Sequence, residues 1–413
     1  MENRYEKYKD SGIAWIGEIP EHWDVCKLST LFFQHKQKNS GSQEINLLSL
    51  SYGNIKRKDI NTLEGLLPES FENYNIIDRD DIVFRLTDLQ NDKKSLRSAL
   101  CKERGIITSA YVTIRKRTNI NPIFFNYLFR SYDECKVFYG LGDGVRQGMN
   151  FDDLRNLDVL LPQQDIQQYI ATYLDQKCNE IDELIALQEE MITKLQSYKQ
   201  SIITEAVTKG LDKNVPLKDS GIEWIGKIPE HWTLKRIKNI CDNLDYLREP
   251  ISAEHRSRNN PIYDYYGASG VIDKIDYYNV DDQVLLIGED GANLVMRNLP
   301  LVYKAKGKFW VNNHAHILKP KDNNYDFCAY AFEAADYSLF ITGSAQPKLS
   351  QENLGRIKIA IPPIHEQQTI ADYLDQKCSE IDELISIKQQ KIEKLKDYKK
   401  SLIFECVTGK RKV

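Results

Sequence analysis

The chain has 413 residues, of which 41% are hydrophobic and 28% charged, and its formal net charge is −4. This length predicts two or three domains, and the composition is that of an ordinary globular protein. No apolar run approaches the roughly 18 residues of a membrane span, and the charged N-terminal stretch lacks the apolar core of a signal peptide, so we expect a cytoplasmic protein without membrane contact.

Two stretches of the sequence occur twice. DSGIAWIGEIPEHW (Asp10–Trp23) returns as DSGIEWIGKIPEHW (Asp219–Trp232), and ATYLDQKCNEIDELI (Ala171–Ile185) returns 200 residues later as ADYLDQKCSEIDELI (Ala371–Ile385). Solenoid repeats have periods of about 20–50 residues, so a period of this length indicates a duplicated domain-sized unit. The chain is therefore predicted to hold two copies of one plan.

Between the repeats, both halves have a mixed helix and strand pattern. Asn121 is a predicted helix cap, with Pro122 at the first helical position. Alternating and β-branched runs predict the strands. The candidate strands are Ile45–Leu50, Asp81–Leu86, Ile106–Lys116, Leu157–Leu161, Tyr263–Val271, Val284–Gly288, His314–Leu318 and Ile357–Ile361.

Two long segments carry an uninterrupted helical pattern. Residues 163–209 contain no proline or glycine, and His365–Thr408 is their counterpart. A helix of about 40 residues is about 60 Å long, too long for one globular core, so the two helices are predicted to pair antiparallel. The predicted seam and subunit-docking residues are Leu184, Leu187, Met191, Leu195, Tyr198, Ile202, Leu384, Ile387, Ile392, Leu395, Tyr398 and Leu402.

The two copies share their frames but differ in their middles, which suits a protein that reads two different things at a fixed separation. We predict an α+β fold with two globular α/β domains, separated by two long antiparallel coiled-coil helices and related by a pseudo-twofold internal duplication. The predicted segments are a frame segment (1–23), a first globular domain (24–162), a long helix (163–209), a linker with the repeated frame segment (210–232), a second globular domain (233–362) and a C-terminal long helix (363–413).

Motifs for catalysis or metal binding are weak. Asn121-Pro-Ile-Phe and Asn260-Pro-Ile-Tyr lack the second proline of the amino-methyltransferase motif, and no phosphate-binding loop is present. His314 and His316 could share one face of a strand, but no third ligand has suitable spacing, so strand packing is favoured. The eight cysteines form no CxxC pair and are expected to be buried thiols. We therefore predict no catalytic residue, metal site or cofactor in this chain.

The repeated DSGIxWIGxIPEHW, the QQYIATYLDQK and EQQTIADYLDQK helix starts, both IDELI segments, and the LPQQD and IPPIHEQQ junctions are similar to those of specificity (S) subunits of type I restriction–modification systems. The resemblance covers the whole chain. It implies two target-recognition domains that each read half of a bipartite, asymmetric site in double-stranded DNA, and long helices that dock two modification (methyltransferase) subunits. Restriction (endonuclease and translocase) subunits can join. S-adenosylmethionine then belongs to the modification subunit, and ATP and magnesium to the restriction subunit.

A DNA reader needs Lys and Arg for phosphates and Arg, Lys, Asn or Gln for base edges. Both predicted domains offer such side chains in polar loops and strands. The candidates are Lys56, Arg57, Lys58, Arg85, Lys93, Lys94, Arg97, Arg146, Gln147, Arg256, Arg258, Asn259, Lys306, Lys308, Asn312, Asn313, Gln346 and Lys348.

Two other interpretations remain. A structural coiled-coil adapter without a DNA role agrees with the acidic net charge, because a phosphate-binding protein is usually locally basic. A fragment of a methyltransferase is disfavoured by the missing cofactor motifs.

Overall fold

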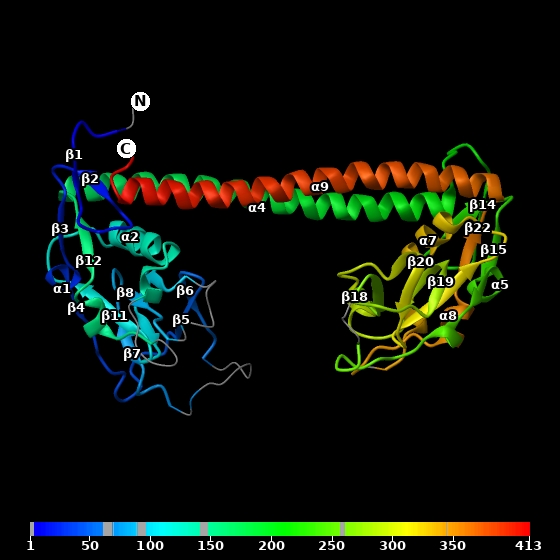
Figure 1. Cartoon of the computed structure of the whole chain (residues 1–413), viewed down its shortest axis with the longest axis horizontal. Helices are drawn as coiled ribbons and strands as arrows, with labels where there is room; N and C mark the ends of the chain where they lie inside the picture. Colours follow the sequence, from blue (N-terminus) through cyan, green and yellow to red (C-terminus); the bar gives the residue numbers. More distant parts are fainter. Residues whose placement is uncertain are drawn as a thin grey trace. The chain divides into compact units, whose positions relative to one another are not determined.

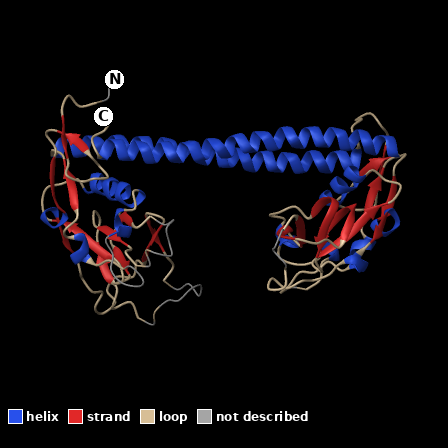
Figure 2. Ribbon diagram, viewed as in Figure 1, coloured by secondary structure: helices blue, strands red, loops and turns tan. Residues whose placement is uncertain are grey.

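The computed structural model describes residues 4–413 except 61–67, 69, 88, 90–95, 141–147, 257–260 and 344. The chain divides into two compact units, which we name unit 1 (Met1–Gln188 with Gln389–Val413) and unit 2 (Glu189–Lys388). Each unit combines a strand-rich globular domain with one stretch of each long helix (Figure 1, Figure 2). Among the described helices, none has both the length and the apolar character needed to span a membrane.

The long helices are α4 (Gln164–Lys209) and α9 (Ile364–Val407). Their bounds agree with the predicted bounds to within one residue at each end. In unit 1, Asp182 of α4 contacts Lys399 of α9, and in unit 2, Lys199 of α4 contacts Asp382 of α9. In each unit, therefore, one end of α4 lies beside the opposite end of α9, and the predicted antiparallel pairing is confirmed (Figure 1).

The globular part of unit 1 is built on short antiparallel strands and short helices. Its four-stranded sheet has the order β4 (Phe32–Gln34), β11 (Val112–Lys116), β8 (Ile82–Phe84), β9 (Ser98–Leu100). Three further pairs are β3 (Asp24–Lys27) with β12 (Asp158–Leu161), β5 (Leu48–Ser51) with β6 (Asn54–Arg57), and β7 (Asn75–Ile77) with β10 (Gly105–Ile107). The helices are α1 (Leu28–Leu31), α2 (Pro122–Glu134) and α3 (Phe151–Leu154).

The globular part of unit 2 contains a larger sheet. Six strands follow the order β16 (Cys241–Asn243), β21 (Ala315–Pro320), β19 (Val280–Gly288), β20 (Val302–Val311), β17 (Tyr263–Gly267), β18 (Gly270–Ile275). All neighbours are antiparallel except β17 and β20. A separate pair joins β15 (Thr233–Arg236) to β22 (Lys358–Ile361), and the helices are α5 (Ile237–Ile240), α6 (Asn293–Met296), α7 (Tyr325–Ala334) and α8 (Gln351–Arg356).

The duplicated frame segments fold alike. Each makes a two-stranded hairpin, β1 (Tyr8–Asp10) with β2 (Glu18–Pro20) in unit 1 and β13 (Leu217–Asp219) with β14 (Lys227–Pro229) in unit 2. The hairpins lead to Trp23 and Trp232, which are fully buried. In unit 1 the Tyr8 hydroxyl donates to the Gly409 carbonyl at 3.1 Å, just after α9 ends. A side chain at Gly210, just after α4, would contact the ring of Trp232. Each frame segment therefore closes the C-terminal end of a long helix.

Two strand predictions are wrong in the same way. Ile106–Lys116 forms β10 and β11, joined by a turn in which the Tyr111 N–H donates to the Thr108 carbonyl at 3.2 Å. Tyr263–Val271 forms most of a hairpin of β17 and β18, whose turn ends at Gly270 with φ of +88°. Both turns are short and contain residue types that are also common in strands. The sequence pattern therefore does not mark where the first strand of each hairpin ends.

Candidate nucleic-acid interface and the helix frame that holds it

A buried glutamine near the start of each long helix fastens the globular domain to that helix. Gln167 accepts a hydrogen bond from the backbone N–H of Asn121 at 2.9 Å, and Gln367 accepts one from that of Asn324 at 2.8 Å. Each glutamine also donates to the carbonyl of the proline five residues earlier, at 2.7 and 2.9 Å respectively. Both glutamines are almost fully buried, so these bonds satisfy groups that water does not reach.

The neighbouring glutamines complete the attachment. Gln168 accepts from the side-chain amide of Asn121 at 2.8 Å, and Gln368 accepts from that of Asn324 at 2.7 Å. The same asparagines cap α2 and α7 through their side-chain oxygens. We call this arrangement, Asn121 with Gln167 and Gln168 and its counterpart Asn324 with Gln367 and Gln368, the glutamine clamp. It explains the repeated QQ pair of the sequence.

A tyrosine–aspartate bond forms a second attachment. Tyr127 of α2 donates to Asp175 at 2.8 Å, and Tyr330 of α7 donates to Asp375 at 2.7 Å. Burial, together with the neighbouring cysteine and aspartate, raises the pKa of both phenols well above the usual value, so both remain protonated donors. The repeated YLDQK sequence therefore holds two different domains by the same contact.

The seam between the long helices follows a period of 3.5 residues. In α4 its buried and half-buried members are Leu174, Cys178, Ile181, Ile185, Gln188, Ile192, Leu195, Lys199, Ile202 and Ala206. In α9 they are Leu374, Cys378, Ile381, Ile385, Lys388, Ile392, Leu395, Lys399, Leu402 and Cys406. Five of the predicted seam residues belong to this set: Leu195, Ile202, Ile392, Leu395 and Leu402.

The other predicted seam residues lie outside the seam. Leu184, Leu187, Met191, Tyr198, Leu384, Ile387 and Tyr398 are 39–59% exposed. Each comes one residue before a seam position and so lies on one flank of its helix. The sequence offers two neighbouring stripes with the same spacing, and the prediction combined residues of both, because apolar side chains occur in each. The true seam instead includes Gln188, Lys199, Lys388 and Lys399.

Reciprocal ion pairs fix how the helices match. The Lys399 ammonium contacts both carboxylate oxygens of Asp182 at 2.6 Å in unit 1. In unit 2, Lys199 contacts both oxygens of Asp382 at 2.7 and 2.6 Å. Both aspartates come from the repeated IDELI sequence. Each lysine occupies a seam position. Any other register of the two helices would therefore separate the lysine from its aspartate.

Three of the basic candidates of unit 1 that the structure describes lie on or next to β6. Lys56 and Lys58 are exposed, and Arg57 is exposed but pairs with Glu103, with one contact of 2.9 Å. Arg85 is half-buried beside β8. The remaining candidates Lys93, Lys94, Arg146 and Gln147 lie outside the described residues.

Arg97 is a correction. Its side chain is fully buried, its N–H donates to Asp133 at 2.6 Å, and its guanidinium donates to the Thr87 carbonyl at 3.0 Å and lies over the ring of Tyr139. The polar sequence around Arg97 predicted an exposed loop. In the structure, Arg97 comes directly before β9 and bonds Asp133 of α2. In this fold it holds the domain together and does not reach a phosphate.

The candidates of unit 2 form two groups. Lys306 and Lys308 are exposed on β20, and Lys308 lies over the ring of Tyr278 at 4.6 Å. Arg256 is half-buried, pairs with Asp273 at 3.1 Å and lies over a tyrosine ring. Asn313, Gln346 and Lys348 are exposed in the second group, whereas Arg258 and Asn259 lie outside the described residues.

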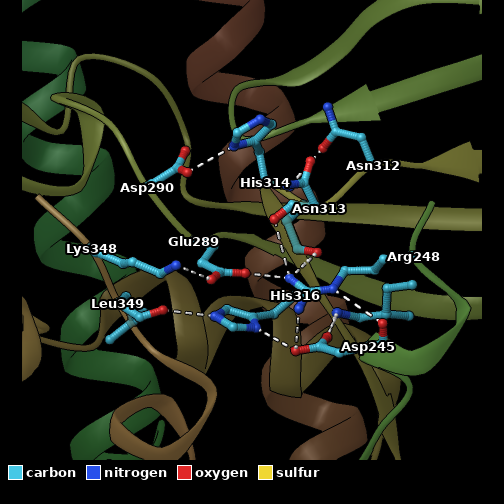
Figure 3. A network of polar contacts seen from close by, with 12 residues as sticks. Asp245, Arg248, Glu289, Asp290, Asn312, Asn313, His314, His316, Lys348 and Leu349 are labelled. Carbon is cyan, nitrogen blue, oxygen red and sulfur yellow. Dashed lines mark hydrogen bonds and ion pairs between the residues drawn. The ribbon is translucent and has the colours of Figure 1, made fainter. Parts of the chain in front are cut away.

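The second group surrounds a network at the end of the large sheet (Figure 3). Glu289 follows β19, is almost fully buried, and pairs with Lys348 at 3.0 Å and with Arg248. Burial opposes ionisation of Glu289, but these cations lower its pKa below the usual value. Asn312 is a second correction, because it is buried and its side chain accepts from the His314 N–H at 2.8 Å to shape the turn before β21.

The two histidines of this network take separate partners. His316 is fully buried, with Nδ1 at 2.6 Å from Asp245 and Nε2 at 2.8 Å from the Leu349 carbonyl (Figure 3). His314 is exposed and contacts Asp290 at 2.7 Å. By these hydrogen bonds, the two histidines connect their own segment to three others, which contain Asp245, Asp290 and Leu349. Sequence reasoning missed Asp245, Glu289 and Asp290, because isolated carboxylates carry no spacing signal.

One group of side chains in the described part of the chain has the spacing of metal ligands: His35, Asp78 and Asp81, whose ligand atoms lie within 4.8 Å of one another. Arg115 donates to both aspartates at 2.7–2.8 Å. Burial alone raises the pKa of Asp78, but the guanidinium groups of Arg115 and Arg104 lower it below its usual value. A guanidinium already balances these carboxylates, so the arrangement is an ion-pair network.

Comparison with known proteins agrees with this architecture. Residues 229–397 match the family described as the type I restriction modification DNA specificity domain. A putative type I restriction enzyme specificity subunit of Haemophilus influenzae is 31% identical over 160 residues, 38% of each chain. The putative MjaX specificity subunit of Methanocaldococcus jannaschii is 24% identical over 425 residues, 96% of each chain.

Solved structures share the fold. A chain from a study of complex assembly and conformational transition of the type I R-M system superposes with a TM-score of 0.70 at 15% identity, covering 95% of this chain and 99% of the other. The HsdS subunit of Thermoanaerobacter tengcongensis gives 0.50 at 16% identity, covering 95% and 98%. Residues 229–397 thus match the type I restriction modification DNA specificity domain family, and the chain as a whole, with its duplicated frame and paired long helices, is similar to type I restriction–modification specificity subunits.

Proposed function

We propose that this chain is the non-catalytic DNA reader and assembly scaffold of a type I restriction–modification complex. Each globular domain reads one half of a bipartite, asymmetric site in double-stranded DNA. The long helices dock two modification subunits, and restriction subunits join that assembly. S-adenosylmethionine binds the modification subunit, and ATP and magnesium bind the restriction subunit, so this chain needs no cofactor.

The observation that carries the proposal is that one frame holds two unlike domains. The glutamine clamp and the tyrosine–aspartate bond are the same in both units. The domains that they hold differ, with a largest sheet of four strands in the described part of unit 1 and six in unit 2. Different readers on equivalent mounts are what an asymmetric site with two half-sites requires.

Exposed apolar side chains on the helices support the scaffold role. Leu184, Leu187 and Tyr398 are exposed in unit 1, and Met191, Tyr198, Leu384 and Ile387 in unit 2. Each precedes a seam position, whereas Asp182 and Asp382 each follow one, so the apolar residues lie on the opposite flank. Apolar residues repeated along one flank of a coiled coil are typical of helices that bind further helices.

Salt dependence of DNA binding tests the reading role. Within the described residues, Lys56, Lys58 and Lys306 form no ion pair, so each is available for phosphate. Affinity of the complex for specific DNA should fall linearly in log K against log[salt], and Lys56→Gln with Lys58→Gln should reduce the slope by about 2. The matched control is Lys7→Gln with Lys9→Gln, two exposed lysines of the frame. A flat plot for the unsubstituted complex supports the coiled-coil adapter instead.

A second experiment tests the helices as the ruler. Inserting one heptad after Glu190 and one after Gln390 lengthens each helix by about 10.5 Å and keeps the 3.5-residue period. Methylated sites should then have a spacer longer by about three base pairs, since each base pair rises 3.4 Å. The control inserts a heptad in α4 alone, which misaligns the reciprocal ion pairs and should abolish assembly. Unchanged spacers in the double insertion contradict the ruler role.

A further inference from the structure

The duplication places the same three side chains at the C-terminal end of each long helix. In unit 1 these are Tyr173, Tyr398 and Glu405, and in unit 2 they are Tyr373, Tyr198 and Glu205. The members of each pair lie 200 residues apart in sequence. We call each set a tyrosine–glutamate triad. Because the two triads come from one ancestral plan, the occupant of one indicates what the other can hold.

The triad of unit 1 is occupied by an arginine of the same chain. Arg411 follows the end of α9, and its N–H donates to the Glu405 carbonyl at 3.0 Å. Its guanidinium lies 3.9 Å from the Glu405 carboxylate and is 26% exposed. Burial by itself lowers the pKa of Arg411. The phenols of Tyr173 and Tyr398 and the carboxylate of Glu405 raise this pKa by more, so it lies above its usual value.

The triad of unit 2 has no such occupant. Tyr198, Tyr373 and Glu205 line a groove of about 480 Å³ between the end of α4, the linker after it and α9. The second residue after the terminal glycine is Arg411 in unit 1, but Asp212 in unit 2. Among the described residues, no cation lies within ion-pair distance of Glu205, although Lys209 and Lys213 also line the groove. Tyr198 is 59% exposed, so the groove opens to solvent.

We propose that the unit 2 groove binds an arginine side chain of a modification subunit, which occupies the place that Arg411 fills in unit 1. A guanidinium suits this site because it can pair with a carboxylate and lie against tyrosine rings. The inference rests on the scaffold role proposed above, since Tyr198 belongs to the exposed apolar flank of α4. It also makes the two docking positions unequal, one closed by the chain itself and one open.

The experiment uses the specificity subunit co-produced with its modification subunit. Native mass spectrometry gives the stoichiometry, and titration gives the affinity of each modification subunit. Glu205→Gln and Tyr198→Ala should each weaken one of the two modification subunits about tenfold and leave the other unchanged. Glu189→Gln, which removes an exposed carboxylate from α4 outside the groove, is the matched control and should change neither affinity.

A gain-of-contact variant guards against misfolding. Asp212→Arg places an arginine where Arg411 lies in unit 1, so it should fill the groove within the chain and weaken the same modification subunit. Adding Glu205→Gln to Asp212→Arg should remove the blocking carboxylate contact and give no further loss. Circular dichroism melting should show that these variants are folded.

Photo-crosslinking identifies the occupant. A benzoylphenylalanine at Leu211, which lines the groove, should crosslink to an arginine-containing peptide of the modification subunit. A crosslink only to DNA or to a second copy of this chain overturns the inference, as does unchanged affinity in Glu205→Gln and Tyr198→Ala. If the unsubstituted chain binds no modification subunit at all, the scaffold proposal fails instead, so the two failures are distinguishable.

Discussion

Removal of Asp182 should test whether the reciprocal ion pairs specify the helix match. Lys399 is only 12% exposed at its seam position, whereas Asp182 is 57% exposed. Fully exposed pairs contribute about 0.2–1 kcal/mol, and removing one partner of a buried pair costs about 3–5 kcal/mol. For this intermediate burial we expect Asp182→Asn to destabilise unit 1 by about 1–2 kcal/mol, because it leaves a mostly buried ammonium without its counter-charge.

The companion variant is Lys399→Met, which places an unbranched apolar side chain in the seam. We expect it to cost less than about 1 kcal/mol or to stabilise, because both the charge and its desolvation disappear. The double variant should therefore be more stable than Asp182→Asn alone, with a coupling free energy of about 1–2 kcal/mol. Urea unfolding of the full chain measures the total, and native-state hydrogen exchange of peptides from residues 175–188 and 392–406 localises it to unit 1.

The exposed pair Lys177–Glu180 on α4 is the matched control, since its nitrogen and oxygen are 2.7 Å apart but it lies outside the seam. Its coupling should be the weak one of an exposed helix pair, because water and salt screen both charges. If the Asp182–Lys399 coupling is no larger than this control, the ion pair does not specify the match of the helices, and the apolar seam alone must do so.

Three further predictions concern the globular domains. Gln167→Ala should destabilise unit 1 by about 2 kcal/mol, because it leaves buried backbone groups without partners, whereas the exposed Gln176→Ala should cost about 0.5 kcal/mol or less in urea unfolding. Burial raises the pKa of Asp133 to about 6, so unit 1 should be most stable with this group neutral and lose up to about 3 kcal/mol as pH rises from 4 to 6; Asp133→Asn should abolish that dependence in thermal melts. Burial raises the pKa of Asp245, but its bonds to His316 and to the Ile317 N–H lower it overall, so unit 2 should lose stability as pH falls below about 3.8, and an acid titration of Asp245→Asn should lack this phase.

Features with strong local signals could be predicted from the sequence. The long helices end where their periodicity ends, and the Asn121 cap with Pro122 places the start of α2. The equivalent cap of α7 at Asn324 was missed, because no proline marks it and the segment before it is polar. The role of Asn324 follows only from the structure, in which the side chain of Gln367, far away in sequence, accepts a hydrogen bond from the Asn324 backbone N–H.

The rest depends on packing that the sequence does not reveal. Two apolar stripes of α4 have the same spacing, and only contact with α9 selects the one that contains Lys199. In the same way, Arg97 and Lys58 both sit in polar runs, yet one is fully buried and the other exposed. A basic residue in a loop is thus a candidate for DNA contact only if its side chain is exposed and forms no ion pair with a carboxylate of its own domain.

The glutamine clamp has a consequence for how new specificities arise. The helix of each globular domain that contacts the long helix is α2 in unit 1 and α7 in unit 2. Each is capped by an asparagine and has a tyrosine six residues later: Asn121 and Tyr127 in α2, and Asn324 and Tyr330 in α7. A domain that keeps this pair keeps the two attachments to the long helix that both units share. Gene segments coding for such domains can therefore be exchanged by recombination within the near-identical repeats that flank them. Under the proposed function, an exchange of this kind changes what one globular domain reads, while the paired helices keep the contacts that they make with each other.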